Sequence, residues 1–429
     1  MKEIHEILTF IKAHHKFIDS AIPLIASENV TSLAVRNALL SDFQHRYAEG
    51  LPMHRVYAGC EYIDKIELKA IELAKDLFDA EHANVQPTSG SVANLALYSA
   101  FTKPGDTIIT LSIRDGGHIT MNKVGLTGKL SLNVINFPFD RDEMNIDVDK
   151  AEKVLRNAEP KLVLFGASVF LFPHPVKELR DVAKEIGAIM AYDASHVLGL
   201  IAGKQFQDPL KEGIDVVTSS THKTFPGPQH GMILCKAEFA EAMDRAVFPG
   251  VLSNHHLHNV TALAIALCEM KVFGRDYAKQ IVKNAKALAE ALANEGFNVI
   301  AEHKGFTESH QVLVDLIPSG LSGLKAEKML EQAGILVNRN LLPWDKERNR
   351  NFRDPSGIRI GVQEVTRLGM REDEMEDIAR FMAEVLLRKK DPVVVVKKVA
   401  EFRREFVRVE YSFDKGKAYC WQEIWNLER

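Results

Sequence analysis

Short apolar runs separated by amphipathic stretches dominate the middle of the chain, and this pattern restricts the possible folds more than any other feature. The runs show no polar alternation, which is typical of strands in a parallel sheet whose two faces are both covered. Two intervening stretches, 148–158 and 176–186, repeat apolar residues at helical spacing. Alternating strands and helices predict an α/β domain with a mostly parallel sheet. The apolar runs lie at 108–109, 162–165, 189–192, 216–217 and 232–234.

The pattern changes after the FPG at 248–250, where long helical stretches precede isolated strand-like pieces. This order predicts a smaller α+β domain after the large one. The polar segment 338–357 is predicted to be a loop, and the tail after 390 is compatible with a helix but contains a strand-prone run at 393–396. The expected helices lie at 258–273, 277–295, 323–333 and 372–388, and the expected strands at 312–314 and 358–360.

The N-terminal sequence MKEIHEILTFIKAHH places Ile4, Ile7, Leu8 and Ile11 on one face of a helix. It has neither the uninterrupted apolar run nor the small-residue cleavage site of a signal peptide. We therefore expect an amphipathic helix that packs against another domain or subunit.

Composition and charge exclude several classes of protein. The 429 residues include 54 basic and 58 acidic side chains, so the net charge of −4 lacks the basic footprint of a nucleic-acid-binding protein. No run of about 18 apolar residues occurs, which argues against a transmembrane helix. The four cysteines are far apart and form no CxxC pair, so we expect no disulfide framework and no zinc site. Such a chain suits a reducing cytoplasm.

Lys223 follows the apolar run 216–217, within the segment SSTHKTF. A buried lysine is costly unless its amine is paired or neutralised. A Schiff base with a carbonyl cofactor would neutralise it. The alternative is a lysine at the end of a strand that reaches solvent, and this segment alone leaves both interpretations open.

Asp193 ends the apolar run at 189–192, so it would lie at the carboxyl end of a strand, where open α/β sheets bind ligands. A carboxylate there can keep a pyridinium nitrogen protonated, and the ring then acts as an electron sink for a carbanion. An aspartate in this position can also cap a helix. Thirty residues separate Asp193 from Lys223, which leaves room for a crossover and a further strand, so both can reach one pocket.

The segment QPTSGSVAN at 86–94 opens a helical stretch with small hydroxyl residues. The backbone N–H groups and the dipole of such a helix N-terminus favour a phosphate group. An ordinary helix cap would have the same residues, and no GK[ST] follows, so the segment is not a Walker A motif. Phosphate loop, aspartate and lysine, in this order on an α/β domain, favour a pyridoxal-phosphate enzyme.

Four further segments closely resemble signatures of the serine hydroxymethyltransferase family: LIASEN at 24–29, HRYAEG at 45–50, RDGGHIT at 114–120 and SGIRIG at 356–361. With THKT at 221–224 and YDASHVLGL at 192–200, the resemblance covers about residues 20–390. The segments FPGVLSNHHLH at 248–258 and GKQFQDPL at 203–210 resemble the archaeal branch of the family.

The resemblance implies an aspartate-aminotransferase-like α/β fold, known as fold type I, with a smaller C-terminal α+β domain. It implies reversible transfer of the serine hydroxymethyl group to a reduced pterin through a pyridoxal-phosphate aldimine, giving glycine and the methylene-pterin. A cytoplasmic homodimer with shared active sites is expected, with neither nucleic acid nor a membrane as partner. The expected parts are an N-terminal helical arm at 1–45, a large cofactor-binding domain at 46–272 and a small domain at 273–429.

The family resemblance also implies which residues contact the cofactor. Lys223 would carry the internal aldimine, Asp193 would pair with the pyridine nitrogen, and His118 would stack on the ring. Ser89, Gly90 and Ser91 would hold the phosphate, and the other implied cofactor contacts are His196, Ser220, His222 and Tyr47.

The implied substrate contacts come from several segments. Arg359 would bind the serine carboxylate as a bidentate fork, assisted by Ser27. Glu49 and Tyr57, like Tyr47, would reach the site from the partner subunit, and Glu49 would transfer a proton beside the hydroxymethyl group and the pterin. Asn340 would lie near the pterin.

The sequence departs from bacterial members of the family at several positions. Gln229 replaces an arginine, His230 replaces an expected glycine, and His54 replaces a common lysine. The glycine-rich stretch after FPG is absent, so the phosphate contacts that it makes across the dimer are not carried over. The archaeal-like segments make tetrahydromethanopterin a candidate acceptor beside tetrahydrofolate, and the sequence does not decide between them.

Other functions have less support in the sequence. His255, His256 and His258 have no acid or cysteine beside them at ligand spacing, so we expect no metal site. A pterin-independent aldolase acting on β-hydroxy amino acids such as threonine is the alternative enzyme, and the retained region around Glu49 argues against it. The intact set of catalytic residues argues against a binding protein, for example for RNA, on the same fold.

Overall fold

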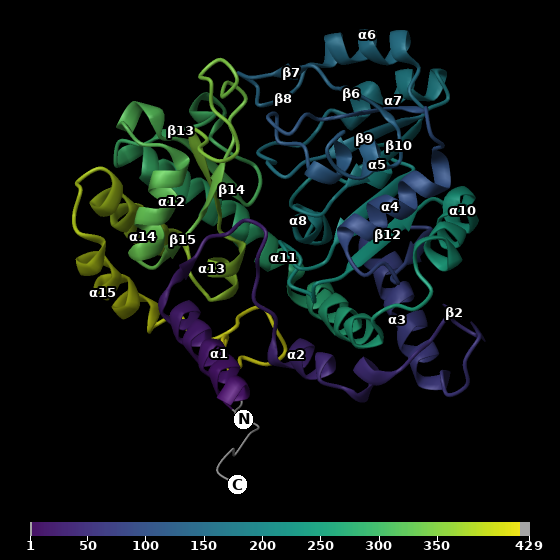
Figure 1. Cartoon of the computed structure of the whole chain (residues 1–429), viewed down its shortest axis with the longest axis horizontal. Coiled ribbons are helices and arrows are strands. Elements are labelled where there is room, and N and C mark those ends of the chain that lie inside the picture. The colour runs from purple at the N-terminus through teal and green to yellow at the C-terminus, as the bar shows by residue number, and fades with distance from the viewer. Residues whose placement is uncertain (1, 421–429) are drawn as a thin grey trace.

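The computed structural model describes residues 2–420, and a seven-stranded sheet lies at the centre of its larger part, on the right in Figure 1. The strand order is β4-β12-β11-β10-β9-β5-β6. Strand β12 runs antiparallel to β11 and β4, and the other neighbours are parallel, which confirms the predicted mostly parallel sheet. The strands are β4 (His82–Asn84), β5 (Thr107–Thr110), β6 (Asn133–Asn136), β9 (Leu162–Gly166), β10 (Ile189–Asp193), β11 (Val216–Ser220) and β12 (Gly231–Cys235).

Both faces of this sheet are covered, as the apolar runs predicted. Val163 and Phe165 of β9 point into one apolar core, and Leu162 and Leu164 point into another on the opposite face. Successive residues of a strand face opposite ways, so a strand buried on both sides has no polar alternation.

Helices fill the connections between the strands. The stretches predicted at 148–158 and 176–186 form α6 (Val148–Ala158) and α7 (Val176–Glu185), and the predicted apolar positions Leu155 and Leu179 are buried. The other helices of this part are α2 (Leu33–Leu39), α3 (Glu61–Phe78), α4 (Gly90–Phe101), α5 (Leu126–Lys129), α8 (Leu198–Ala202), α9 (Pro209–Glu212) and α10 (Ala240–Arg245). Two short hairpins pair β2 (Gly50–Leu51) with β3 (His54–Arg55) and β7 (Phe139–Asp140) with β8 (Asn145–Ile146).

A four-stranded antiparallel sheet, on the left in Figure 1, forms the centre of the C-terminal part. The pieces predicted at 312–314 and 358–360 are confirmed as its two central strands. The helices predicted near 323–333 and 372–388 are also present. The elements are β13 (Asn298–Val299), β14 (Gln311–Asp315), β17 (Gly357–Gly361), β16 (Asn338–Asn340), α12 (Gly323–Gln332), α13 (Gln363–Arg367) and α14 (Glu372–Leu386).

Helix α11 (Leu257–Asn294) is one helix of 38 residues, so the prediction of two helices at 258–273 and 277–295 is wrong. Gly274 lies inside it, where a Cβ on Gly203 would be 2.4 Å from the Gly274 carbonyl oxygen, so glycines permit a close approach of the two segments. The expected domain boundary at 272–273 falls within this helix, and that division remains a prediction. Helix α11 is long and apolar enough to span a bilayer, but half of its most apolar 18-residue window is buried in the fold.

The run at 393–396 is helical, and its assignment as strand-prone was wrong. It belongs to α15 (Pro392–Arg403), which begins with a side-chain cap because Val393 N donates to Asp391 Oδ1 at 2.9 Å. Val395 and Val399, four residues apart, are buried on one helical face. The cap and this burial outweigh the β-propensity of valine. The predicted loop 338–357 contributes β16 and then runs irregularly to β17.

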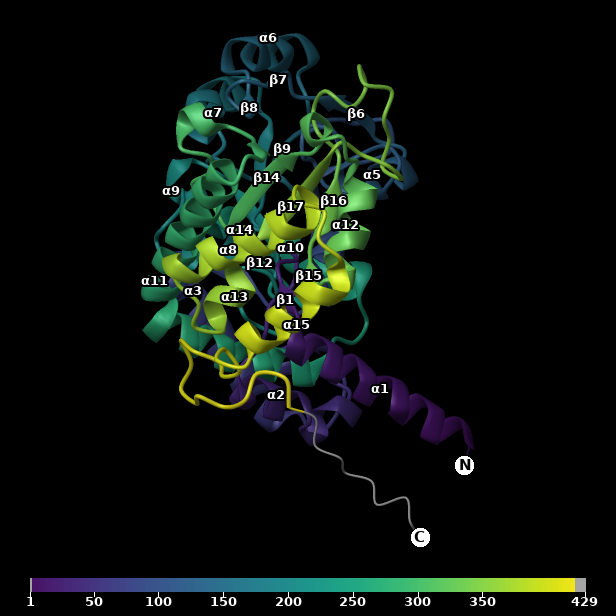
Figure 2. The same ribbon diagram turned by 90° about the vertical axis from the view of Figure 1, so that its left-hand side faces the viewer.

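The N-terminus forms the expected helix α1 (Lys2–Ser20), which has no buried residue and projects from the body in Figure 2. It lies against the C-terminal helix at 392–403, and packing on another subunit remains a prediction. Beyond α1, strand β1 (Ile22–Pro23) pairs with β15 (Ile335–Leu336), so the segment that follows α1 is attached to the C-terminal part. Residues 421–429, the end of the predicted small domain, lie outside the described residues.

Candidate active site

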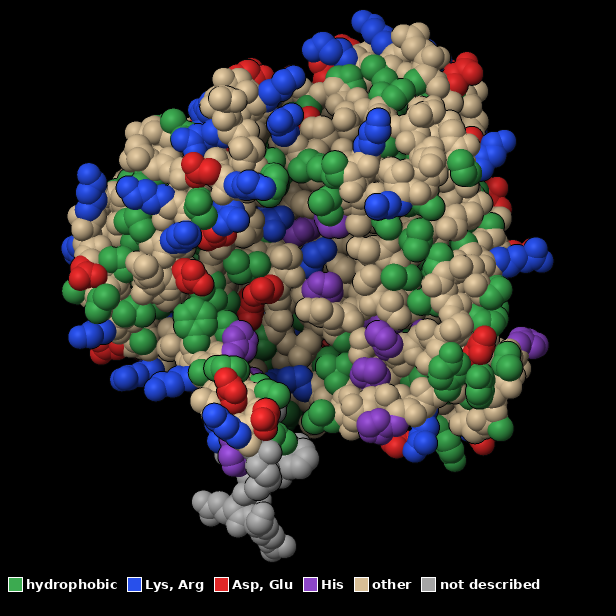
Figure 3. Space-filling model, in the orientation of Figure 1, with side chains coloured by type: hydrophobic (Ala, Val, Ile, Leu, Met, Phe, Trp, Pro, Cys, Tyr) green, Lys and Arg blue, Asp and Glu red, His purple; other side chains and the backbone are tan. Residues whose placement is uncertain are grey.

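The carboxyl ends of β10 and β11 open into a hollow between the two parts of the molecule, and Figure 3 shows Lys, Arg and His side chains gathered there. The hollow contains an inner cavity of about 200 Å³ and an outer cavity of about 380 Å³. Both are lined by His118, Ser168, His196 and Lys223. A larger side cavity of about 790 Å³ lies beyond the loop after β1 and shares Ser27 with the outer cavity.

Lys223 lies three residues beyond β11, and its side chain lines both the inner and the outer cavity. Burial lowers the pKa of its amine from 10.5 to about 8, against the opposing charge of Asp193. Its backbone carbonyl accepts a hydrogen bond of 2.6 Å from Asn29 Nδ2. The lowered pKa increases the fraction of neutral, nucleophilic amine near neutral pH relative to an exposed lysine.

Asp193 ends β10, lines the inner cavity and is almost fully buried. Its Oδ2 accepts a hydrogen bond of 2.8 Å from Asn94 Nδ2, and its Oδ1 accepts one of 2.9 Å from Ser195 N. Thr218 Oγ1 donates to Asn94 Oδ1 at 2.6 Å, which fixes the orientation of the Asn94 amide. The sequence prediction omitted Asn94, although a lone amide within the apolar stretch VANLALYSAF was a signal.

The predicted phosphate loop forms the far wall of the inner cavity, which Ser89, Gly90 and Ser91 all line. Ser89 is the N-cap of α4, because its Oγ accepts a hydrogen bond from Val92 N at 3.2 Å. A Cβ on Gly90 would be 3.0 Å from Ser220 N, so only glycine fits against the end of β11 without displacement. The capped N-terminus of α4 thus lies at the position where the sequence predicted a phosphate group.

Two polar atoms next to this loop have no partner within residues 2–420: Ser220 Oγ and His222 Nδ1 are both buried and unpaired. Buried polar atoms are nearly always hydrogen-bonded, so an unpaired pair at a helix N-terminus fits a phosphate group. Together with the amine of Lys223 and the carboxylate of Asp193, these atoms match the phosphate, the carbonyl and the ring nitrogen of pyridoxal phosphate.

His118 and His196 line both cavities and are kept neutral. Burial lowers the pKa of both imidazoles, and nearby cations add to this at His196. Gln311 Oε1 accepts from Phe170 N at 2.8 Å, so the Gln311 amide must donate to His196 Nδ1, at 3.0 Å. The Nε2 of His196 therefore carries the proton. Gln311, a polar residue at the start of β14, was not predicted to take part in the site.

Arg359 on β17 supplies the buried cation of the outer cavity. Its Nη1 donates to Ser168 O at 2.6 Å and its Nε donates to Asn338 Oδ1 at 3.1 Å. Burial lowers the pKa of the guanidinium to about 10. No carboxylate pairs with it within the described part of the chain, so it is available for an anionic substrate. Ser27 and Asn340 line the same cavity, and their contacts to substrate and pterin remain predictions.

Tyr47, Glu49 and Tyr57 do not line these cavities in their own chain. The rings of Tyr47 and Tyr57 lie 4.8 Å apart and are about half exposed, at 44% and 48%. Tyr47 Oη also lies 3.3 Å from Ser253 Oγ. The structure thus places the three residues on another surface, and their predicted action across a subunit interface is compatible with this position.

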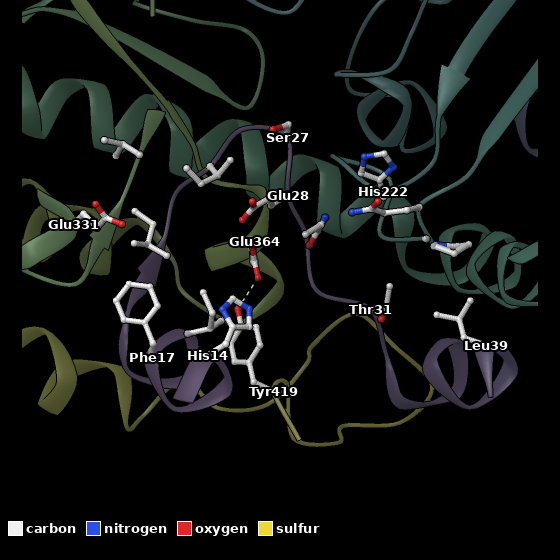
Figure 4. A pocket seen from close by; sticks show the side chains of 18 of the residues that line it. His14, Phe17, Ser27, Glu28, Thr31, Leu39, His222, Glu331, Glu364 and Tyr419 are labelled. Atoms are coloured by element: carbon white, nitrogen blue, oxygen red, sulfur yellow. Dashed lines mark hydrogen bonds between the residues drawn. The ribbon is translucent and has the colours of Figure 1, made fainter. Parts of the chain in front are cut away.

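Figure 4 shows the lining of the side cavity, which includes Ser27 and Glu28 of the loop after β1. His222 lines both this cavity and the inner one. Tyr419 Oη donates to Glu364 Oε1 on the wall of the cavity, and burial raises the pKa of Glu364 to about 7. Glu28, nearby, also has a pKa raised by burial.

The histidines that were considered as metal ligands have other surroundings. His255 Nε2 lies 2.9 Å from Glu67 Oε2, and the rings of His256 and His258 lie 5.8 Å apart. Across residues 2–420, no three His, Cys, Asp or Glu side chains are grouped as metal ligands would be. His230, at the expected glycine position, is buried and lies with Nε2 2.7 Å from Val85 O.

The sheet order, the lysine beyond β11, the carboxylate at the end of β10 and the hydroxyl loop at α4 together fit fold type I, a class of pyridoxal-phosphate-dependent enzymes. The sequence model of the family described as serine hydroxymethyltransferase matches residues 2–382. The chain belongs to the serine hydroxymethyltransferase family, which confirms the family, the fold and the enzyme class that the sequence predicted.

Curated relatives agree with the family assignment over almost the entire chain. A serine hydroxymethyltransferase of Methanocaldococcus jannaschii is 57% identical over 94% of this chain and 95% of the relative. One of Korarchaeum cryptofilum is 56% identical over 95% and 96%, and one of Methanopyrus kandleri is 55% identical over 97% and 96%. All three organisms are archaea, in line with the archaeal-like segments.

Proposed function

We propose that the chain binds pyridoxal 5'-phosphate through Lys223 and transfers the hydroxymethyl group of serine to a reduced pterin, leaving glycine. The observation that carries this proposal is that Lys223, Asp193 and Arg359 line two adjoining cavities in a member of this family. When bound, the cofactor supplies an electron sink for the carbanion that remains at the serine Cα after the Cα–Cβ bond breaks.

Residues around the inner cavity would hold the cofactor. The neutral amine of Lys223 would bond covalently to its carbonyl carbon, and Asp193, held by Asn94, would keep the ring nitrogen protonated. His118 would cover the ring face. The phosphate would accept hydrogen bonds from the loop at the N-terminus of α4 and from the unpaired atoms of Ser220 and His222, with Ser89, Gly90 and Ser91 forming the loop.

Residues around the outer cavity would orient the substrate. Arg359 still has an Nη2 group free of any partner in residues 2–420, and one Nη1 hydrogen, to form a bidentate pair with the serine carboxylate. Ser27 would donate to the same carboxylate. Neutral His196 would donate from Nε2 toward the phenolic oxygen of the cofactor.

We further propose a cytoplasmic homodimer in which Tyr47, Glu49 and Tyr57 enter the active site of the partner subunit. Two observations support this: the tyrosines are half exposed away from their own cavity, and a large side cavity opens beside Ser27 and His222. The partner's Glu49 would then move a proton at the serine hydroxyl group. Four free cysteines are compatible with the cytoplasm.

The carrier would bind at the rim of the outer cavity, where Asn340 lies between Arg339 and Leu341. Tetrahydrofolate and tetrahydromethanopterin share the reduced pterin and differ in their tails. The archaeal organisms of the relatives favour tests with both carriers.

Two measurements test the proposal. Borohydride reduction of the purified protein should attach the cofactor to the peptide that contains Lys223, and mass spectrometry of Lys223→Ala should show no such adduct. Glycine formation from serine should depend on an added reduced pterin. Equal rates with and without a carrier would favour the aldolase, and an adduct at another lysine would refute the assignment of Lys223.

A further inference from the structure

The main chain around Glu49 is held by the guanidinium of Arg55, across the β2–β3 hairpin. Arg55 Nη1 donates to the carbonyl oxygens of Ala48, at 3.0 Å, and of Gly50. These two residues flank Glu49 in the sequence, so a single side chain fixes the carbonyl groups of both its neighbours. Val56 N also donates to Glu49 O at 2.9 Å.

Arg55 is itself fixed by two acids of helix α3. Its Nε donates to Asp64 Oδ1 at 2.7 Å and its Nη2 donates to Glu67 Oε2 at 2.6 Å. Asp64 Oδ2 also accepts from Met53 N at 3.0 Å, in the turn of the hairpin. The side chains of Arg55 and Glu67 are only 3% and 1% exposed, so solvent does not screen this pair.

Glu67 is the centre of this cluster. Its Oε1 accepts from Gln86 Nε2 at 2.7 Å, and its Oε2 accepts from Arg55 and lies 2.9 Å from His255 Nε2. Burial alone would raise the pKa of Glu67, but the hydrogen bonds and charges of His255 and Arg55 outweigh it and lower the pKa. Gln86 Nε2 also donates to Gly50 O at 3.0 Å, so Glu67 reaches the hairpin through two side chains.

We infer that Arg55 and Glu67 are positioning residues for Glu49, and that their buried ion pair sets the direction in which the hairpin presents the Glu49 carboxylate. This inference rests on the proposed role of Glu49 in proton transfer at the partner's active site. Burying two charges is a costly way to stabilise a two-residue strand pair, and apolar residues of similar volume would do so at least as well. Arg55 holds the two carbonyl groups beside Glu49 by hydrogen bonds. Apolar side chains could not do this, because they have no hydrogen-bond donors.

The test compares two reactions of the holoenzyme that differ in their need for Glu49. Transfer of the serine hydroxymethyl group needs the proton transfer proposed for Glu49, whereas glycine has no hydroxymethyl group, so exchange of its α-proton with solvent does not need that step. Glu67→Gln keeps the shape of the side chain and removes its charge. We expect kcat for the transfer to fall about tenfold to a hundredfold, with the serine KM changed by less than about threefold and the exchange rate by less than about twofold.

A matched control separates positioning from stability. Glu269→Gln makes the same change in another buried pair, between α11 and α13, in which Arg367 Nη2 lies 2.7 Å from Glu269 Oε2. Thermal unfolding should report destabilisation in both variants, and only Glu67→Gln should lose transfer selectively. Arg55→Lys, which keeps the charge and loses the fork, is the second variant in case Glu67→Gln does not fold, and it should show the same selective loss.

The outcomes distinguish this inference from the function on which it rests. If Glu49→Gln retains full transfer, the proposed role of Glu49 is wrong. If Glu49→Gln abolishes transfer while Glu67→Gln and Arg55→Lys leave transfer unchanged, or reduce transfer and exchange equally, the positioning role is wrong. In the double variant Glu49→Gln/Glu67→Gln, the residual transfer should equal that of Glu49→Gln alone, because the two changes act on one carboxylate.

Discussion

Replacement of Arg359 by lysine should weaken serine binding while leaving the cofactor in place. The guanidinium donates from Nε to Asn338 and with one Nη1 hydrogen to Ser168. The other Nη1 hydrogen and the Nη2 group are left to bind the substrate carboxylate. An ammonium group has three donors, so after contacts to Asn338 and Ser168 it retains one for the carboxylate. The variant thus loses one charge-assisted hydrogen bond of the bidentate pair.

The size of the effect follows from that single bond. Hydrogen bonds to charged groups contribute about 1.5–3 kcal/mol. Since about 1.4 kcal/mol corresponds to a tenfold change in equilibrium constant, serine should bind about tenfold to a hundredfold more weakly. The low dielectric around the buried Arg359 favours the upper part of this range.

Serine and glycine binding can be measured by titration of the cofactor absorbance, together with the serine KM of the transfer reaction. Arg339→Lys is a matched control, because Arg339 lines the same cavity but pairs with Glu327 at 2.6 Å. Serine affinity should be unchanged in that control. A dissociation constant for serine within about twofold of the unmodified enzyme in Arg359→Lys would place the carboxylate site elsewhere.

Four other experiments test the remaining parts of the proposed site. Asp193→Asn should retain cofactor but lose most turnover, and a near-normal kcat would contradict its role at the ring nitrogen. In cofactor-free protein, the rate of attachment should rise about tenfold per pH unit and level off above pH 8, since only the deprotonated Lys223 amine reacts and its pKa is about 8; a rate independent of pH between 6 and 8 would oppose this. Glu49→Gln and Lys223→Ala, each inactive, should regain activity when mixed under subunit exchange, and no recovery would refute the shared site. For the carrier, a kcat/KM ratio of tenfold or more in favour of tetrahydrofolate, about 1.4 kcal/mol, would refute a preference for tetrahydromethanopterin.

The central strands were predictable because their burial on both faces demands apolar residues at every position. Strand β9 reads LVLFG and β10 reads IMAYD, and each lies where the apolar runs indicated. That Asp193 and Lys223 would line one cavity was predictable for a related reason. Asp193 follows such a run and Lys223 follows the next, and the carboxyl ends of parallel strands meet at one edge of a sheet.

The two errors have local physical causes. A glycine within a helical pattern does not show whether the helix ends or another segment packs against it, and at Gly274 the helix continues. Four consecutive valines favour a strand by propensity. The segment is nevertheless helical, because Asp391 caps the helix N-terminus and Val395 is buried in the apolar core.

The sequence by itself therefore determined the fold class, the family and the candidate site residues, because these depend on local pattern and on motifs within single segments. Only the tertiary structure decided how those residues are held. Three polar contacts of the structure join residues that are far apart in the sequence: Asn94 and Asp193 are separated by 99 residues, Gln311 and His196 by 115, and Glu67 and His255 by 188. A polar side chain in an apolar stretch signals a buried partner, but the partner is set by how strands and helices pack, and no periodicity along the chain encodes that pairing.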